Sequence, residues 1–536
     1  MSSQSSLPVA DLDSAAAVVE RGGAIVGELT SSVSRTGGPD AAQQLAYDLA
    51  HCASAVATAK AMLAYGAKGP IEAALTCAFV ADVGRDLAAR AFGREAVWGD
   101  GVAAALDEIR PFVATFADPT FVASLASQPG PRHLDEEFEM VADTFHRLAA
   151  NKVRPVAEHV HRTNSDIPES VIEQLAEIGG FGLSVPEEYG GFAAGGDNDY
   201  LAMMVATEEL SWGSLGVGGS LITRPEILTR ALVMGGTEEQ KQYWLPKLAT
   251  AEVLAAIAVT EPDYGSDVAG LKVTARPAEH HESGEAGWVI NGVKTWCTFA
   301  ARANVFLLLA RTNPEPAAGH KGLSLFIVPK PQGDGHGFQF AQEGGGRIEG
   351  RAIDTIGYRG MHSYEVAFED WWVPADHQIG GDAGLGRGFY LQMQGFENGR
   401  VQTAARAVGL MQAAYEAAVE YANARVVFGA PIMDYQLTQV KLGRMAAIIQ
   451  ASRQFMYEVA RMMARGEGAL EASMVKAYVC RAAEWVTREA MQIHGGMGYA
   501  EEFPVSRYFV DARVLSIFEG ADETLCLKVI ARRLSA

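Results

Sequence analysis

One acidic residue near the C-terminus, Glu519, stands where it could act as a general base. It follows the apolar pair Ile517 and Phe518 and precedes Gly520. Apolar side chains remove water from a carboxylate and raise its pKa toward the range in which a base works near neutral pH. Gly520 lets the backbone turn sharply before a closing helix. The alternative is that Glu519 only caps that helix, which begins near Asp522.

Two upstream segments carry groups that suit a flat, polar ligand. The stretch 259–267 leaves an expected strand and enters a Gly/Ser loop, whose N–H groups and hydroxyls suit an anion. The stretch 288–298 is typical of a hairpin with a turn at Asn291-Gly292. Strand alternation then places Trp296 and Thr298 on one face, where they could stack on a heterocycle and hydrogen-bond its nitrogen. The alternatives are an ordinary turn and a buried Trp–Thr pair.

A third set of residues lies at expected helix ends. Arg425 and Phe428 follow one helix, Gln436 lies in the next, and the glycine-rich turn 492–499 follows a third. An Arg, a helix terminus and a close backbone approach suit a pyrophosphate. His494 is expected to be structural, because no second His, Cys or carboxylate lies at metal-ligand spacing. We therefore predict no metal site.

Composition limits the classes of function. The 536 residues are 49% hydrophobic and 20% charged, which predicts several domains or one large layered unit with ample core. A net charge of −21 argues against a general nucleic-acid or anionic-membrane binder. Five scattered cysteines without CxxC spacing indicate a reducing compartment, with neither disulfides nor a thiolate metal site. Because we find no signal-peptide pattern and no long apolar run, we expect a cytoplasmic protein without membrane insertion.

The pattern of elements predicts an α+β multidomain chain. Residues 1–115 form a helical N-terminal extension, 116–135 a linker, and 136–252 a second helical domain that ends with helices at about 198–211 and 224–250. Short β-branched segments fill residues 253–380. Four long helical blocks, at about 386–425, 433–465, 468–494 and 519–534, fill 381–536 as an antiparallel bundle. Residues 72–80 also align without gaps on residues 471–479. Chance is one explanation, and the other is that the N-terminal segment is a degenerate copy of part of the bundle, packing as an extra helical domain.

The order and spacing of these motifs, within an α–β–α layout, resemble the acyl-CoA dehydrogenase family of flavoproteins over residues 136–536. The resemblance implies that family's fold: an α-helical domain, a β-barrel or sandwich middle domain and a C-terminal four-helix bundle. It implies FAD as cofactor, a homodimer or homotetramer, and electron-transfer flavoprotein as electron acceptor. The implied reaction converts an acyl-CoA to its trans enoyl-CoA.

Residue roles follow from the same resemblance. Glu519 falls on the catalytic base, which removes the α-proton while the β-hydride passes to flavin N5. Some members carry the base at the position that is Gly399 in this chain, and a glycine cannot act as a base. Glu519 is therefore the first choice for the base, and Glu397 is a distant second. The implied FAD contacts are Val259, Thr260, Gly265, Ser266, Trp296, Thr298, Arg425, Phe428, Gln436, Gln492, Gly495, Gly496 and Glu523. The implied substrate contacts are Ser266, Glu397, Arg400 and Gly520.

The chain departs from the family at Ala521, usually Thr, and at 299–301, usually Asn-Gly-Gly. The N-terminal extension is unusual for the family. With it, the overall pattern resembles members that act on a short branched dicarboxylic substrate, and the resemblance implies (2S)-methylsuccinyl-CoA, oxidised to mesaconyl-CoA. Its distal carboxylate needs a cation, for which Arg224 is the candidate; the alternative is a surface helix residue. Three rival functions stay open: a dehydrogenase of another short or branched acyl-CoA, an acyl-CoA oxidase, and a nucleic-acid-binding flavoprotein of the same fold.

Overall fold

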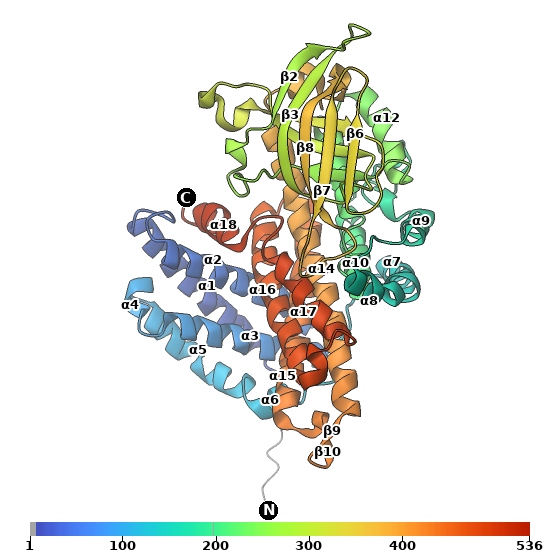
Figure 1. The fold of residues 1–536 in the computed structure, drawn as a ribbon. Helices are drawn as coiled ribbons and strands as arrows, with labels where there is room; N and C mark the ends of the chain where they lie inside the picture. The colour runs from blue at the N-terminus through green and yellow to red at the C-terminus, as the bar shows by residue number, and fades with distance from the viewer. Residues whose placement is uncertain (1–6, 197) are drawn as a thin grey trace, which may run out of the picture. The chain divides into compact units, whose positions relative to one another are not determined.

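The computed structural model describes residues 7–196 and 198–536. The chain divides into two compact units: residues 1–140 with 403–536 form the first, and residues 141–402 form the second. The first unit is helical, whereas the second combines helices with one large sheet (Figure 1). Within the described ranges, no helix is long and apolar enough to cross a membrane.

The N-terminal extension is helical, as predicted. Its long helices are α1 (Leu12–Arg35), α2 (Gln43–Gly66), α3 (Pro70–Ala91) and α5 (Val102–Phe116), with the short α4 (Glu95–Trp98) between α3 and α5. Pro70 suits the first turn of α3, where its missing N–H costs nothing. The stretch predicted as a linker contains one further helix, α6 (Pro119–Ala123), because Asp118 caps it by accepting the Thr120 amide.

Three of the four predicted C-terminal blocks are long helices: α14 (Gly388–Ala424), α15 (Gln436–Ala464) and α16 (Ala469–Ile493). The fourth, predicted as one helix over 519–534, is wrong in detail. It consists of α18 (Asp522–Thr524), a π-helical stretch η9 (Leu525–Ile530) and α19 (Ala531–Leu534). The structure also adds α17 (Pro504–Leu515), which begins at a proline.

The extension packs against the bundle inside the first unit. The rings of Phe79 in α3 and Tyr478 in α16 meet edge to face, 5.8 Å between centroids. These two residues are equivalent in the ungapped internal match. Farther along, the Tyr415 hydroxyl of α14 donates to the Ala126 carbonyl over 2.8 Å. The extension is therefore an extra helical layer on the bundle, as expected, while its origin as a copy stays a prediction.

Among the described residues, seven helices belong wholly or mainly to the second unit: α7 (Glu136–Leu148), α8 (Arg154–Thr163), α9 (Glu169–Glu177), α10 (Asp199–Gly213), α11 (Thr223–Gly235), α12 (Glu238–Ala249) and the short α13 (Gly381–Gly384). A single helix over 224–250 was predicted, but the chain breaks after Gly235. Thr237 and Gln240 form a capping box that starts α12 as a new helix.

The sheet of the second unit follows the order β1-β4-β2-β3-β8-β7-β6, with β5 also paired to β4. Helices α11 and α12 cover one side, where Leu245 and Leu248 share a core with Leu307 and Leu325. A second core, which includes Phe306 and Val366, lies among the strands themselves. The strand bounds are β1 (Ala255–Ala258), β2 (Thr274–Glu279), β3 (Ala286–Thr298), β4 (Val305–Arg311), β5 (Leu323–Pro329), β6 (Gly337–Ala341), β7 (Arg347–Ile353) and β8 (Ser363–Pro374).

The predicted hairpin turn at Asn291-Gly292 is wrong, because both residues lie inside β3. The register of β3 with β8 shifts between Ile290 and Gly292, and Gly292 has φ +129°. The dipeptide therefore marks a β-bulge, for which a glycine with positive φ is equally suited. The Asn291 side chain completes the bulge by exchanging hydrogen bonds of 2.9 and 3.0 Å with Asp370 of β8.

Candidate active site

Glu519 lies in the loop between α17 and α18 with a left-handed backbone, φ +54°, and Gly520 follows at φ +102°. A non-glycine residue in this region costs roughly 1–3 kcal/mol and persists only where its surroundings hold it. Ala521 is the N-cap of α18 and makes no side-chain capping bond. Glu519 is therefore not the cap of α18, and the alternative interpretation is wrong. Its side chain is half-buried.

Contacts from the bundle hold this loop. Lys476 of α16 donates from Nζ to the Gly520 carbonyl over 2.8 Å. Phe518, the residue before Glu519, lies under the guanidinium of Arg406 in α14, 5.0 Å from its ring centroid. The strained backbone at Glu519 is thus supported by a buried lysine on one side and a cation–π contact on the other.

In the second unit, one backbone and one side-chain hydrogen bond join the loop after β1 to the end of β3. The Thr295 amide donates to the Thr260 carbonyl over 2.8 Å, and Lys294 Nζ donates to the Val259 carbonyl over 2.8 Å. Two motifs that lie apart in the sequence are thus brought together. Gly265 and Ser266 lie farther along the same loop, both exposed.

Trp296 and Thr298 differ in their surroundings. Trp296 has φ +57°, and its side chain is 53% exposed. Thr298 is buried, with Oγ1 3.0 Å from the Ser363 hydroxyl. The strict alternation on which the shared face was predicted does not hold here, because the register with β8 shifts between Lys294 and Cys297. The result is a half-exposed indole two residues before a buried hydroxyl.

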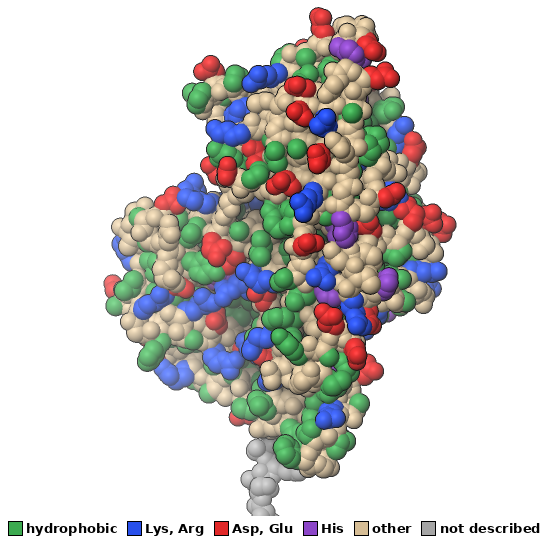
Figure 2. All heavy atoms as spheres, in the orientation of Figure 1, with side chains coloured by type: hydrophobic (Ala, Val, Ile, Leu, Met, Phe, Trp, Pro, Cys, Tyr) green, Lys and Arg blue, Asp and Glu red, His purple; other side chains and the backbone are tan. Residues whose placement is uncertain are grey.

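The residues predicted to hold the adenine half of FAD gather at one end of the bundle. Tyr421 of α14 stacks on His494, just after α16, with centroids 4.3 Å apart, so the ends of these two helices meet. Phe428, in the turn between β9 (Val426–Val427) and β10 (Ala430–Pro431), is 99% exposed. Hydrophobic side chains also appear on the face over this end in Figure 2. The remaining members lie around it: Arg425 after α14, Gln436 at the start of α15, Gln492 in the last turn of α16, and Gly495 and Gly496 just beyond.

His494 has a structural place, as expected. It is buried, with Nδ1 2.8 Å from the Ala490 carbonyl oxygen. Burial lowers the pKa of its ring, so His494 is neutral at neutral pH. Its ring therefore serves as the stacking partner of Tyr421.

Helix α11 and the first half of α14 carry the candidate substrate residues. Asn398 of α14 donates to Glu226 of α11 over 3.3 Å, so Glu397 and Arg400 lie on the part of α14 beside α11. Arg224 is only 6% exposed, which corrects the alternative of a surface residue. Burial raises the pKa of Cys297 to about 12, and the cations of Lys294 and Arg224 act against this rise. Arg224 therefore lies near the end of β3 that carries Trp296.

Two groups of residues near the predicted sites were not found from the sequence. The buried pair Lys294–Glu261 joins β3 to the loop after β1, with Nζ 2.9 Å from Glu261 Oε1. Tyr47 and His51 of α2 contact Asp522, three residues beyond Glu519. No local pattern signals these contacts, because Tyr47 is 475 residues from Asp522.

The exposed residues fit the cofactor that the resemblance implies. A flavin nucleotide needs flat apolar surfaces for its rings and close backbone approach for its phosphates. Trp296 and Phe428 offer exposed aromatic faces. Gly265, Gly495 and Gly496 have open space where a Cβ would stand. Each unit therefore offers both an aromatic surface and an unobstructed backbone.

Three family comparisons cover the chain after the extension. The acyl-CoA dehydrogenase N-terminal domain matches residues 135–252, the middle domain matches 256–371, and the C-terminal domain matches 386–535. Together these matches span the helical, β and helical layers in the order in which the structure has them.

Individual relatives of the chain are also named as acyl-CoA dehydrogenases. A (2S)-methylsuccinyl-CoA dehydrogenase of Cereibacter sphaeroides is 44% identical over 76% of this chain and 71% of its own length. A mitochondrial 2-methylacyl-CoA dehydrogenase of Solanum tuberosum is 34% identical over 75% of this chain and 91% of its own. Among solved structures, a glutaryl-CoA dehydrogenase with glutaryl-CoA has 30% identity and a TM-score of 0.67, covering 74% of this chain and 95% of that chain.

Proposed function

Because the chain belongs to the acyl-CoA dehydrogenase family of FAD-dependent oxidoreductases, we propose that it oxidises (2S)-methylsuccinyl-CoA to mesaconyl-CoA. The observation that carries this substrate is the 44% identity to an enzyme of that name. The second half of the proposal is that Glu519 is the catalytic base. Two observations support this role: Glu519 has a strained left-handed backbone that its neighbours hold in place, and it falls on the position of the base in the family motif.

The proposed chemistry requires a base and stabilisation of negative charge. A thioester α-proton is a weak acid, so removing it needs hydrogen-bond donors at the carbonyl oxygen where charge develops. Glu519 takes the α-proton, and its left-handed backbone sets the direction of its own N–H, which we assign to that carbonyl oxygen. Lys476 keeps Gly520 in place, which fixes the peptide next to the base. Bound FAD supplies the acceptor for the β-hydride at N5.

The cofactor is proposed to be held by two sets of residues. In the second unit, Trp296 would stack on the flavin, Thr298 would hydrogen-bond it, and Val259, Thr260, Gly265 and Ser266 would line its chain. In the first unit, the end of the bundle holds the adenine half of a neighbouring subunit's FAD through Arg425, Phe428, Gln436, Gln492, Gly495 and Gly496, and Glu523 completes the contacts. The full exposure of Phe428 supports a contact with another molecule at this end. We accordingly propose a homodimer or homotetramer.

Arg224 is proposed to receive the distal carboxylate of the substrate, while Glu397, Arg400, Gly520 and Ser266 contact the CoA thioester. A buried guanidinium pairs strongly with a carboxylate because little water competes for either group. Arg224 is buried on the helix that covers β1 and lies near the end of β3. A charged acyl group would therefore be preferred over a neutral one of the same size.

A dehydrogenase of neutral 2-methyl-branched acyl-CoA is the second candidate, favoured by the 34% identity to the Solanum tuberosum enzyme. The two candidates differ in the charge of the acyl end. Anaerobic reduction of the protein-bound flavin by a panel of CoA thioesters separates them. We expect (2S)-methylsuccinyl-CoA to bleach the flavin fastest. Faster bleaching by 2-methylbutyryl-CoA would favour the second candidate.

The electron acceptor is proposed to be an electron-transfer flavoprotein. One structural relative, 30% identical with a TM-score of 0.66, comes from work on such a flavoprotein of Acidaminococcus fermentans. Steady-state turnover with that class of acceptor, compared with hydrogen peroxide formed in air, tests the proposal. Rapid peroxide production without the acceptor would instead indicate an oxidase.

A further inference from the structure

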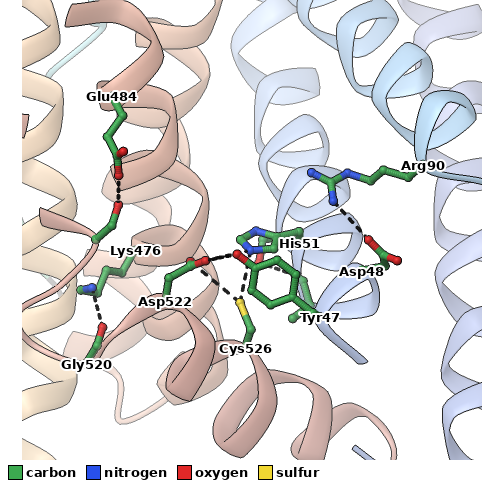
Figure 3. A network of polar contacts seen from close by, with 12 residues as sticks. Tyr47, Asp48, His51, Arg90, Lys476, Glu484, Gly520, Asp522 and Cys526 are labelled. Carbon is green, nitrogen blue, oxygen red and sulfur yellow. Dashed lines mark hydrogen bonds and ion pairs between the residues drawn. The ribbon is translucent and has the colours of Figure 1, made fainter. Parts of the chain in front are cut away.

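The loop that carries Glu519 is held at its C-terminal end through the side chain of Asp522. Asp522 lies three residues after Glu519, and its amide donates to the Ser516 carbonyl over 3.1 Å, which closes the loop. Its side chain points away from the bundle toward helix α2 of the extension (Figure 3). The position of this carboxylate therefore fixes one end of the strained segment 519–520.

Two residues of α2 hold the Asp522 carboxylate. The Tyr47 hydroxyl donates to Oδ2 over 2.5 Å, and His51 Nε2 lies 3.2 Å from the same oxygen. The rings of Tyr47 and His51 meet edge to face with centroids 4.5 Å apart. His51 is only 5% exposed, so little water competes for these contacts.

Helix α2 is also held through Asp48, whose side chain lies on a different face from those of Tyr47 and His51 (Figure 3). Asp48, between Tyr47 and His51, is buried and pairs with Arg90 over 3.3 Å and with Arg94. Below His51, Cys526 Sγ lies 3.4 Å from Nε2. The two contacts to Asp522 thus come from a helix that is itself tied to Arg90 of α3 and to Arg94.

We propose that Tyr47 and His51 are positioning residues, through which the N-terminal extension sets the geometry of the Glu519 loop. This inference rests on the proposed role of Glu519 as base. An error of about 1 Å in placing a reacting group can cost roughly 10²-fold in rate. The extension therefore contributes to catalysis without touching substrate, in addition to its packing on the bundle.

The same cluster also satisfies the spacing of a metal site, because the ligand atoms of His51, Asp522 and Cys526 lie within 4.8 Å of one another. The hydrogen-bonded description is the better supported one, because the oxygen of Asp522 that faces His51 also accepts the Tyr47 hydroxyl. Metal analysis of the purified protein distinguishes the two. Stoichiometric zinc, whose removal slows flavin reduction, would overturn the proposal.

The test compares Tyr47→Phe with Tyr415→Phe in the FAD-loaded protein. Both variants delete one tyrosine hydroxyl that bonds the N-terminal 135 residues to the C-terminal helices: Tyr47 of the extension bonds Asp522, and Tyr415 of α14 bonds Ala126 of the linker. Only Tyr47 contacts the Glu519 loop. For Tyr47→Phe we expect flavin reduction to slow by about 10-fold or more, with the substrate concentration for half-maximal rate changed less than about threefold. The control should reduce at nearly the parent rate. His51→Gln, which keeps a donor, should lose less than His51→Ala.

A second readout does not depend on activity. Amide hydrogen exchange over residues 516–524 should accelerate in Tyr47→Phe and stay unchanged in Tyr415→Phe. Equal exchange and equal reduction rates in the two variants would overturn the positioning role. If the parent protein is not reduced by any acyl-CoA, the proposed function fails instead. An increase in exchange confined to Tyr47→Phe would then still support the anchor itself.

Discussion

Replacing Lys294 by methionine should destabilise the sheet of the second unit by a predictable amount. Lys294 is fully buried, and its ammonium donates to Glu261 Oε1 over 2.9 Å and to the Val259 carbonyl. Glu261 in turn accepts the backbone amides of Lys272 and Val273 over 2.7 and 2.8 Å. Burial lowers the pKa of Lys294 to about 8, with the Glu261 charge acting against this, so the ammonium is retained at pH 7.

The size of the effect follows from what remains after the substitution. Lys294→Met leaves the Glu261 carboxylate buried without its cation, which costs about 3–5 kcal/mol. A domain of this size shifts its Tm by about 2–4 °C per kcal/mol, so Tm should fall by roughly 6–20 °C. Because Lys294 also joins the loop after β1 to the strand of Trp296, we expect FAD to be lost more readily.

The assay is a double-mutant cycle measured at pH 7 by thermal unfolding and flavin content. Glu261→Gln alone should cost a similar amount, since it leaves the ammonium uncompensated. The double variant Lys294→Met with Glu261→Gln should lose clearly less than the sum, because no buried charge is left uncompensated and the amide oxygen can still accept one of the two backbone amides. A loss below about 1 kcal/mol in Lys294→Met, or strict additivity, would refute this reasoning.

Three further predictions concern single sites. Arg425→Ala should weaken FAD retention without changing which acyl-CoA is preferred; full flavin occupancy and an unchanged oligomer would contradict it. Arg224→Ala should lose about 10- to 150-fold in kcat/KM with methylsuccinyl-CoA and little with 2-methylbutyryl-CoA, with Arg224→Lys as the charge-retaining control; equal losses on both substrates would make Arg224 structural. Burial lowers the pKa of His51, whose ring faces Tyr47, Asp522 and Cys526, with Arg481 and Arg90 opposing its protonation. As the pH falls, the unfolded chain therefore protonates its His51 before the folded chain does, and the folded state loses stability below about pH 6.5. His51→Asn should make the fall in Tm between about pH 7 and 5 less steep. An unchanged slope of Tm against pH would contradict this prediction.

Sequence reasoning was strongest where a local pattern decides the outcome. The helices of the extension and the bundle follow from apolar periodicity and from punctuation at residues such as Pro70. The family fold followed from several motifs in fixed order. The carboxylate between Phe518 and Gly520 was singled out from its neighbours together with the family resemblance, and its role as base stays a prediction.

It failed where tertiary contacts override a local signal. Asn291-Gly292 is a strong turn pattern, yet pairing with β2 and β8 keeps both residues inside one strand. Arg224 has no local mark of burial, because its position depends on how α11 covers the sheet. The anchor of Asp522 joins residues 475 positions apart, and such contacts have no sequence period.

The measurement that tests the central claim most directly is anaerobic flavin reduction by (2S)-methylsuccinyl-CoA in Glu519→Gln beside the parent protein. The substitution keeps shape and hydrogen bonding but removes the base. We expect full FAD content and acyl-CoA binding, with reduction slowed by about 10³-fold. Near-normal reduction in Glu519→Gln would contradict its role as base and shift attention to Glu397.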